Sequence, residues 1–492
     1  MHLAGDNARR GAPRIGDTSR LTGHTVPTPG HCRVLPPTPD LPLDTRRAPP
    51  RRRPLVTDID DLVVRLRATF ASGRTKPLAW RKEQLTRLRA MFTEHRGDIA
   101  DALYADLHKP RADAFATEID FPVREIDHTL NHLDEWLRPR PVASGALAGL
   151  PDGSAAGTQY DPLGTVLIIA PWNYPVQLLL VPLVGALAAG NTVVLKPSEV
   201  TPATSALIAR LVPEYLDKEA VAVVEGGIPE TTELLAQRWD HIFYTGNGMV
   251  GRIVMRAAAE HLTPVTLELG GKSPVFVDRD VDLNRVAERL AGAKFRNAGQ
   301  TCVAPDYVLT DPETASELAA ALAKAVEAMF GTDPQSSDAY GRIVNERHFD
   351  RVSALLGSGT TAFGGQADRD DTYIAPTVLT GVKPDEPVMR EEIFGPVLPI
   401  VEVAGLDEAI EFINDRDKPL ALYGFTESED TRRRLADETS SGGIGFGLPM
   451  AHLRVPELPF GGVGESGLGS YHGPHSIATF SHRKARLDVP LG

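Results

Sequence analysis

Two kinds of hydrophobic pattern divide the chain. From Asp58 to about Leu137, apolar residues recur three and four positions apart with charged residues between them, as in WRKEQLTRLRAMFTEHRGDIADALYADL. This spacing predicts amphipathic helices. From residue 164 onward, short continuous apolar runs alternate with stretches of helical length. Such runs, rich in β-branched residues, are typical of a parallel sheet covered by helices on both faces. The sequence therefore predicts an α/β fold.

The apolar runs give the expected strands. They lie at residues 164–170, 191–196, 220–227, 241–246, 265–271 and 273–278, and the mixed pattern continues over 273–440 with strand-like YVLT and PVLPIVEV. Residues 165–190 are long enough for a membrane span. Because three prolines, an Asn and a Gln interrupt them, we expect a buried strand, a loop and a buried helix, with no membrane anchor.

The first 53 residues differ from the rest in charge. They hold ten Arg and four Asp but no Lys or Glu, so the remaining chain is more acidic than the total of −13. This Pro/Arg-rich leader is expected to be disordered, and it lacks the apolar core of a secretory signal. An acidic body argues against nucleic-acid binding as the function, because phosphate binding needs a basic surface. Two distant cysteines suit a reducing compartment, which favours a cytoplasmic protein.

A glycine motif follows one expected strand. Gly246, Gly248 and Gly251 form G-x-G-x-x-G after HIFYT, in a context that fits dinucleotide binding at a helix N-terminus. On that interpretation Glu268 would hold the adenosine ribose. However, the match comes three strands into the sheet, whereas this fingerprint belongs to the first strand-to-helix turn. The pattern alone leaves the role of Glu268 open.

A single thiol stands outside the leader. Cys302 lies in NAGQTCVAPDY, while the other cysteine, Cys32, lies in the leader. Gly299 and Ala304 are expected to leave room for a substrate, and the neighbouring residues are polar. A lone cysteine is usually a small buried hydrophobe, so the residue alone does not decide between packing and catalysis. A catalytic thiol also needs an activated water and an oxyanion donor.

Several motifs together resemble those of one enzyme family, the aldehyde dehydrogenases, from about residue 58 to the C-terminus. The versions GQTCVAPDY, FYTGN and GSYHGPHSIATFSH are most similar to the class 3 branch, which includes fatty, aromatic and coniferyl-type aldehyde dehydrogenases. The motifs, in order, are APWNYP (170–175), KPSE (196–199), FYTGNGMVG (243–251), LELGGKSP (267–274), GQTC (299–302), EEIFGP (391–396) and LPFGGVGESG (458–467).

The resemblance implies the catalytic roles. Cys302 would attack the aldehyde to give a thiohemiacetal, whose oxyanion would be held by the Asn173 side-chain amide and the Cys302 backbone N–H. Oxidation would leave a thioester, and Glu268 would activate the water that hydrolyses it. The glycine motif therefore misleads about Glu268, which becomes a base.

The resemblance also implies a nicotinamide cofactor. Lys196 and Glu199 would lie at the adenosine ribose, Glu392 at the nicotinamide ribose and Phe394 beside the nicotinamide. We expect NAD, with NADP possible, because Glu199 would repel a 2′-phosphate and Lys196 would offset that repulsion. No metal is expected, because His and Cys show no ligand spacing. The further cofactor residues expected are Pro171, Trp172, Ser198, Gly246, Asn247, Gly248, Gly251, Leu269 and Gly270.

The family fold implies three parts and a homodimer. After a disordered tail at 1–55, a Rossmann-like cofactor domain is expected at 56–138 and 159–267, and an α/β catalytic domain at 268–445. A small oligomerisation element is expected at 139–158 and 446–485.

Two departures and three alternatives remain open. Gly447 and Leu448 stand where polar groups are usual in class 3, and Gly248 stands where a Ser or Thr is usual. A CoA-acylating dehydrogenase is a second hypothesis, which the presence of Glu268 disfavours. A cysteine hydrolase would need a His base, for which His241 and His261 have no matching motif. A non-catalytic relative is the least favoured.

Overall fold

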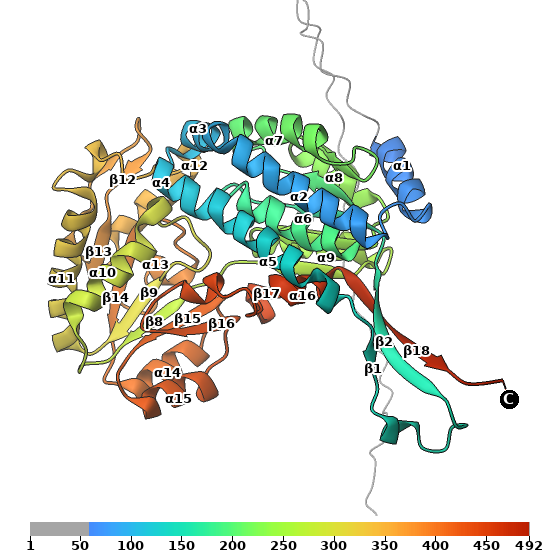
Figure 1. Cartoon of the computed structure of the whole chain (residues 1–492). Helices are drawn as coiled ribbons and strands as arrows, with labels where there is room; N and C mark the ends of the chain where they lie inside the picture. Colours follow the sequence, from blue (N-terminus) through green and yellow to red (C-terminus); the bar gives the residue numbers. More distant parts are fainter. Residues whose placement is uncertain (1–58, 492) are drawn as a thin grey trace, which may run out of the picture. The chain divides into compact units, whose positions relative to one another are not determined.

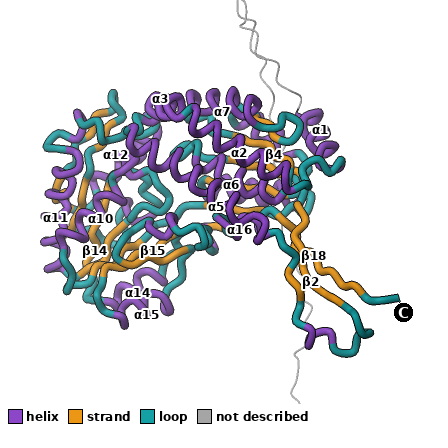
Figure 2. The backbone as a smooth tube through the Cα atoms, viewed as in Figure 1, coloured by secondary structure: helices purple, strands orange, loops and turns teal. Residues whose placement is uncertain are grey.

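The computed structural model describes residues 59–491, so the expectations for the leader lie outside the described residues. The helical pattern at its N-terminal end is confirmed. The elements there are α1 (Ile59–Ala71), α2 (Leu78–Glu94), α3 (Arg96–Leu107), α4 (Arg111–Asp113), the π-helical segment Ala114–Ile119 and α5 (Asp120–Trp136). Figures 1 and 2 show these helices alongside the first sheet.

Six strands form the first sheet. In spatial order they are β17 (Gly467–Leu468), β7 (Val265–Glu268), β6 (His241–Thr245), β3 (Thr165–Ile169), β4 (Thr192–Lys196) and β5 (Val221–Val223). All neighbours are parallel except β17, which runs antiparallel to β7. The helices between the strands are α6 (Gln177–Ala189), α7 (Pro202–Tyr215), α8 (Ile228–Ala236) and α9 (Gly248–Ala259).

Alternate side chains of this sheet enter two different cores. In β3, Leu167 and Ile169 pack in one cluster with residues of α1, α8 and α9, whereas Val166 and Ile168 belong to the cluster that contains α6. Because successive side chains of a strand point to opposite faces, a strand buried on both faces needs apolar residues throughout. This explains the continuous apolar runs of the sequence.

Seven strands form the second sheet. In spatial order they are β10 (Thr360–Phe363), β13 (Thr377–Thr380), β14 (Val397–Glu402), β9 (Tyr307–Thr310), β8 (Pro274–Val277), β15 (Ala421–Phe425) and β16 (Gly443–Phe446). Only β10 is antiparallel to its neighbour. The accompanying helices are α10 (Leu283–Lys294), α11 (Pro312–Phe330), α12 (Glu346–Ser353), α13 (Pro387–Arg390), α14 (Leu406–Asn414) and α15 (Glu429–Glu438), with a small hairpin of β11 (Ala367–Asp368) and β12 (Tyr373–Ile374).

A third sheet joins the Pro/Gly-rich segment to the C-terminal segment. Its order is β1 (Arg140–Pro141), β2 (Ala155–Pro162) and β18 (Ser481–Asp488), and β18 pairs with β2 along its whole length. Figure 1 shows this ladder extending away from α5 and α16 (Gly473–Thr479). The predicted domain boundaries stay predictions. Within 59–491, no helix combines the length and hydropathy that crossing a membrane requires.

Two helical glycines give a matched test of this packing. A β-carbon on Gly185 of α6 would lie 2.6 Å from Ser476 Cβ of α16, whereas one on Gly292 of α10 would have no heavy atom within 4 Å. We expect Gly185→Ala to lower the free energy of unfolding by about 1–3 kcal/mol, because the crowded helices must separate. Gly292→Ala should raise it by up to about 1 kcal/mol. Denaturant unfolding of both variants measures the two effects, and equal shifts would contradict the described packing.

Candidate active site

The carboxyl ends of four strands bring several predicted site residues to one edge of the first sheet. Ile169 is paired in register with Lys196 and with Tyr244, and Thr245 is paired with Glu268. The last residues of β3, β4, β6 and β7 therefore share an edge, as ligand-binding residues do in open parallel sheets. Glu268 and Lys196 are both only 2% exposed there.

The glycine motif forms the turn between β6 and α9. Asn247 caps the helix, because its Oδ1 accepts from Val250 N at 3.0 Å. A β-carbon on Gly251 would lie 2.9 Å from Leu269 Cδ2, so the third glycine lets α9 approach the segment that follows β7. The motif therefore has a packing role in addition to exposing the N-terminal N–H groups of α9.

Lys196 and Glu199 lie together after β4. Lys196 Nζ is 3.6 Å from Glu199 Oε2 and donates to Pro197 O at 2.7 Å. Ser198 Oγ accepts from Val200 N, which shapes the turn between β4 and α7. The Glu199 side chain is half exposed whereas Lys196 is buried, so the pair places a surface carboxylate next to a buried ammonium at the sheet edge.

The loop before Cys302 has an unusual backbone. Asn297, Ala298 and Gly299 all have positive φ, at 53°, 50° and 73°. Non-glycine residues adopt this region at a cost, and such strain is concentrated at functional sites. The structure also changes the expected role of Gly299: its α-carbon packs directly against the Gly395 carbonyl, so the glycine permits a close approach of two loops and does not leave space for a substrate.

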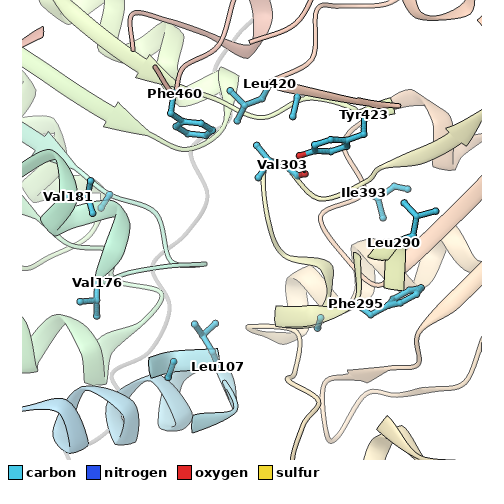
Figure 3. Close-up of a cluster of buried hydrophobic side chains, with 14 of the residues drawn as sticks. Leu107, Val176, Val181, Leu290, Phe295, Val303, Ile393, Leu420, Tyr423 and Phe460 are labelled. Atoms are coloured by element: carbon cyan, nitrogen blue, oxygen red, sulfur yellow. Dashed lines mark hydrogen bonds between the residues drawn. The ribbon is translucent and has the colours of Figure 1, made fainter. Parts of the chain in front are cut away.

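Two hydrogen-bonded supports hold the thiol loop. On one side Tyr423 Oη donates to Val303 O at 2.7 Å (Figure 3). On the other, Asn173 Nδ2 donates to Gln300 O at 3.0 Å, and Asn297 Nδ2 donates to both Asn173 O and Gln300 O at 3.1 Å. Asn173 therefore lies beside the thiol loop as expected, and its amide retains a second N–H for another acceptor.

The Cys302 thiol lies close enough to both predicted carboxyl groups for their charges to change its pKa. Burial raises the pKa of Cys302, and the carboxyl groups of Glu392 and Glu268 raise it further. Burial also raises the pKa of Glu268 well above its usual range, and neither of its carboxyl oxygens has a hydrogen-bond partner within the described residues. Cys302 thus rests as a thiol, with a buried and unconstrained carboxyl group nearby.

Glu392 occupies a more constrained position. Its carboxyl group lies against the α-carbon of Gly270, and the Gly271 N–H bonds to it. Burial, together with the charge of Asp306, raises the pKa of Glu392 to about 8. Glu392 Oε1 is buried without a partner among residues 59–491.

The sequence interpretation missed the residues that hold the 391–396 loop. Arg351 of α12 donates to the carbonyl oxygens of Glu392 at 3.3 Å and Ile393 at 2.8 Å. His348 packs 5.0 Å from the Trp172 ring, whose other neighbour is Phe394 at 5.3 Å, and burial lowers the pKa of His348 to about 4. His348 and Arg351 are three residues apart, which places them on one face of a helix. The sequence alone does not show which residues that face contacts.

The residues present fit a nicotinamide dinucleotide. The capped N-terminus of α9, the Lys196–Glu199 pair and the unpartnered Oε1 of Glu392 lie along the carboxyl edge or the loop that contacts it. Thr245 Oγ1, at the end of β6, is also buried without a partner in this part of the chain. Hydroxyl groups of a ribose and the oxygens of a pyrophosphate match these acceptors and donors.

A cavity of about 330 Å³ lies beside the thiol loop. Its lining includes Asn297 and Thr301 of that loop, Tyr174, Lys109 and the segment Leu448–Met450. The segment in which Gly447 and Leu448 depart from the class 3 pattern therefore does border the cavity next to Cys302.

Comparisons with known proteins agree with this geometry. The model of the aldehyde dehydrogenase family matches residues 55–485. The chain is 50% identical to the mouse aldehyde dehydrogenase named dimeric NADP-preferring, over 88% of this chain and 95% of that protein. It is 51% identical to human aldehyde dehydrogenase family 3 member B1, over 87% and 91%. A solved Staphylococcus aureus AldH, in a substrate-bound state, superposes with a TM-score of 0.85 at 44% identity, over 88% and 94%.

These findings confirm the resemblance to class 3, the α/β fold and an enzyme that oxidises aldehydes with NAD or NADP. The chain belongs to the aldehyde dehydrogenase family.

Proposed function

We propose that this protein oxidises medium or long aliphatic, or aromatic, aldehydes to carboxylic acids through a thioester on Cys302. The observation that carries the proposal is that the Asn173 side chain is hydrogen-bonded to the loop that holds Cys302. The Glu268 carboxyl group is close enough to raise the pKa of the Cys302 thiol. The net reaction converts an aldehyde, water and the oxidised cofactor into an acid, the reduced cofactor and a proton.

In the acylation half, Cys302 attacks the aldehyde carbon. Because burial keeps the sulfur protonated at rest, the thiol must give up its proton as the carbon–sulfur bond forms, and the Glu268 carboxylate is an acceptor close by. The negative charge that develops on the aldehyde oxygen accepts from the second N–H of Asn173 Nδ2 and from the Cys302 backbone N–H. When bound, the nicotinamide supplies the two-electron acceptor that turns the thiohemiacetal into a thioester.

Before deacylation, Glu268 releases the thiol proton to solvent, which is the proton of the net reaction. Glu268 then takes a proton from water and returns it to the sulfur when the thioester breaks. The water attacks the thioester carbon, the oxyanion is held as before, and the carbon–sulfur bond breaks to release the acid and restore the thiol. A carboxylate whose pKa burial has raised is a stronger base than one in solvent. Water activation of this kind is unnecessary when CoA resolves the thioester, so hydrolysis is favoured over CoA acylation.

The cofactor is held by residues of the first sheet and of the 391–396 loop. Lys196 and Glu199 bind the adenosine ribose, the turn Gly246–Gly251 contacts the pyrophosphate, and Glu392 binds the nicotinamide ribose. Because an ammonium and a carboxylate both face this ribose, we propose that NAD and NADP are both used. The mouse relative named dimeric NADP-preferring supports the use of NADP.

The protein is proposed to act as a homodimer. Within residues 59–491, β18 pairs with β2 alone, so its other edge is exposed and a partner subunit can extend the sheet there. Relatives named dimeric support this assembly. A cytoplasmic location and the absence of a nucleic-acid partner stay predictions.

The first prediction separates the two halves of the reaction. Cys302→Ala should abolish reduced-cofactor formation. Glu268→Gln should release about one equivalent of reduced cofactor per site, more slowly than the wild type because the thiol has lost its proton acceptor, and then turn over at least about 100-fold more slowly, because thioester hydrolysis lacks its base. Rapid mixing followed at 340 nm measures both.

The pH profile supplies the control for that experiment. In the wild-type enzyme, kcat should rise with pH as Glu268, whose pKa burial raises, loses its proton. The rise should be absent in Glu268→Gln. If this variant instead kept kcat and raised only the KM for the cofactor, Glu268 would be a ribose ligand.

The second prediction concerns substrate length. Apolar Leu448 and Met450 line the cavity beside the thiol loop, so kcat/KM for straight-chain aldehydes should increase with length, by up to about fourfold per methylene. Leu448→Asp should flatten this dependence, whereas Val64→Asp on the exposed face of α1 should not. A length series with unchanged slope in Leu448→Asp would place the substrate elsewhere.

The third prediction concerns the cofactor ribose. Glu199→Gln should raise kcat/KM for NADP relative to NAD, because a carboxylate that repels the 2′-phosphate has been neutralised. Glu214→Gln is the control, since its side chain is also 51% exposed but lies on α7 next to Arg210. Equal changes in the NADP/NAD ratio for both variants would argue against the assignment.

A further inference from the structure

An ion pair to which no catalytic or cofactor role is assigned lies fully buried next to the site, and its lysine, Lys109, forms part of the wall of the cavity beside the thiol loop. Lys109 Nζ donates to Glu118 Oε1, and the two side chains are 1% and 0% exposed. Removing two charges from water is costly, and buried ion pairs are often no more stabilising than apolar residues of similar volume. Fold stability is therefore a poor explanation for this pair, and its other hydrogen bonds indicate what it does.

Glu118 holds the start of helix α6. Its second oxygen, Oε2, accepts from Val176 N at 3.1 Å and from Gln177 N at 2.9 Å. The first N–H groups of a helix have no partner within the helix, so a carboxylate at this point fixes both the helix end and the segment before it. Glu118 itself lies in the π-helical segment Ala114–Ile119, a local geometry frequent at functional sites.

Lys109 contacts Asn173, which lies three residues before Val176 at the start of α6. Its Nζ donates to Asn173 O at 3.0 Å and lies 4.0 Å from the centre of the Tyr174 ring. Tyr174 Oη in turn lies 2.8 Å from Thr301 Oγ1, next to Cys302. Lys109 therefore binds the carbonyl oxygen of Asn173, and Glu118 binds the backbone N–H groups of Val176 and Gln177, three and four residues later.

We propose that Lys109 and Glu118 are positioning residues for the Asn173 amide. They act through Asn173, fixing its backbone so that the amide N–H points at the aldehyde oxygen in both tetrahedral intermediates. This inference rests on the proposed function, because it needs Asn173 to be the oxyanion donor.

The test uses the double variant Lys109→Met with Glu118→Gln. It removes both charges together, while the glutamine oxygen still accepts from the first turn of α6. We expect kcat/KM for aldehyde oxidation, and for cofactor-independent hydrolysis of p-nitrophenyl acetate, to fall by about 10- to 100-fold, because a small displacement of a catalytic group has effects of this size. The rate of Cys302 alkylation by iodoacetamide, which forms no oxyanion, and the Kd for NADH should not change.

A double-mutant cycle with Asn173→Ala separates positioning from general damage. In the Asn173→Ala background the pair variant should cause no further loss, because its effect passes through the missing amide. A pair variant with wild-type rates, an additive loss, or parallel loss of alkylation would overturn the inference. If Asn173→Ala itself kept full activity, the proposed oxyanion role would fail instead, and the inference with it.

Two controls keep the result interpretable. The exposed pair Arg111 and Asp101, changed to Met and Asn, should leave all four measurements unchanged. If the double variant does not fold, Lys109→Arg keeps the buried charges paired but moves the donor away from Asn173 O, and it should show the same dependence on Asn173. An additive loss in that variant would equally contradict the proposal.

Discussion

The hydrogen bonds between Asn173 and the thiol loop join the two halves of the site. Asn173 follows β3 of the first sheet, whereas the thiol loop precedes β9 of the second. Each contributes donors and acceptors: Asn173 Nδ2 donates to Gln300 O, and Asn297 Nδ2 returns a bond to Asn173 O. Because both residues are buried, these bonds have little competition from water, so the distance between amide and thiol depends on them.

The same bonds maintain a backbone that is unfavourable by itself. Asn297 and Ala298 are in the left-handed region, which costs about 1–3 kcal/mol for each such residue. Gln300 offsets this cost, since its side chain donates to Asn297 O and Arg342 O at 2.9 Å and accepts from Val344 N at 3.0 Å. The Gln300 side chain thus bonds to three backbone groups, which hold the backbone of the thiol loop in this strained conformation.

The sequence predicts the strands and the candidate catalytic residues better than it predicts the contacts that fix these residues in position. Apolar runs marked the strands of the first sheet because a strand buried on both faces leaves a continuous signal. The roles of Cys302, Glu268 and Asn173 were inferred from motifs shared with the aldehyde dehydrogenase family, and they stay predictions. The role of Gly299 could not be inferred in this way, because a close approach to Gly395, almost a hundred residues later, has no local pattern. The contacts of Lys109 could not be predicted either, because nothing in the sequence distinguishes a buried lysine from one in solvent.

The contrast between the two carboxyl groups accounts for their different proposed roles. Glu392 lies against Gly270, and its loop is held through backbone carbonyls by Arg351, so its carboxyl group is fixed in place. A fixed acceptor suits a cofactor hydroxyl, which always arrives at the same point. Glu268 has a fixed backbone, with Gly246 N donating to its carbonyl at 3.0 Å, but both of its carboxyl oxygens are without a partner in the described chain. A side chain that no bond restrains can reach first the thiol proton and then a water molecule. Burial raises the pKa of both groups, so it is the freedom of the side chain, more than its basicity, that suits Glu268 to the proposed role of base.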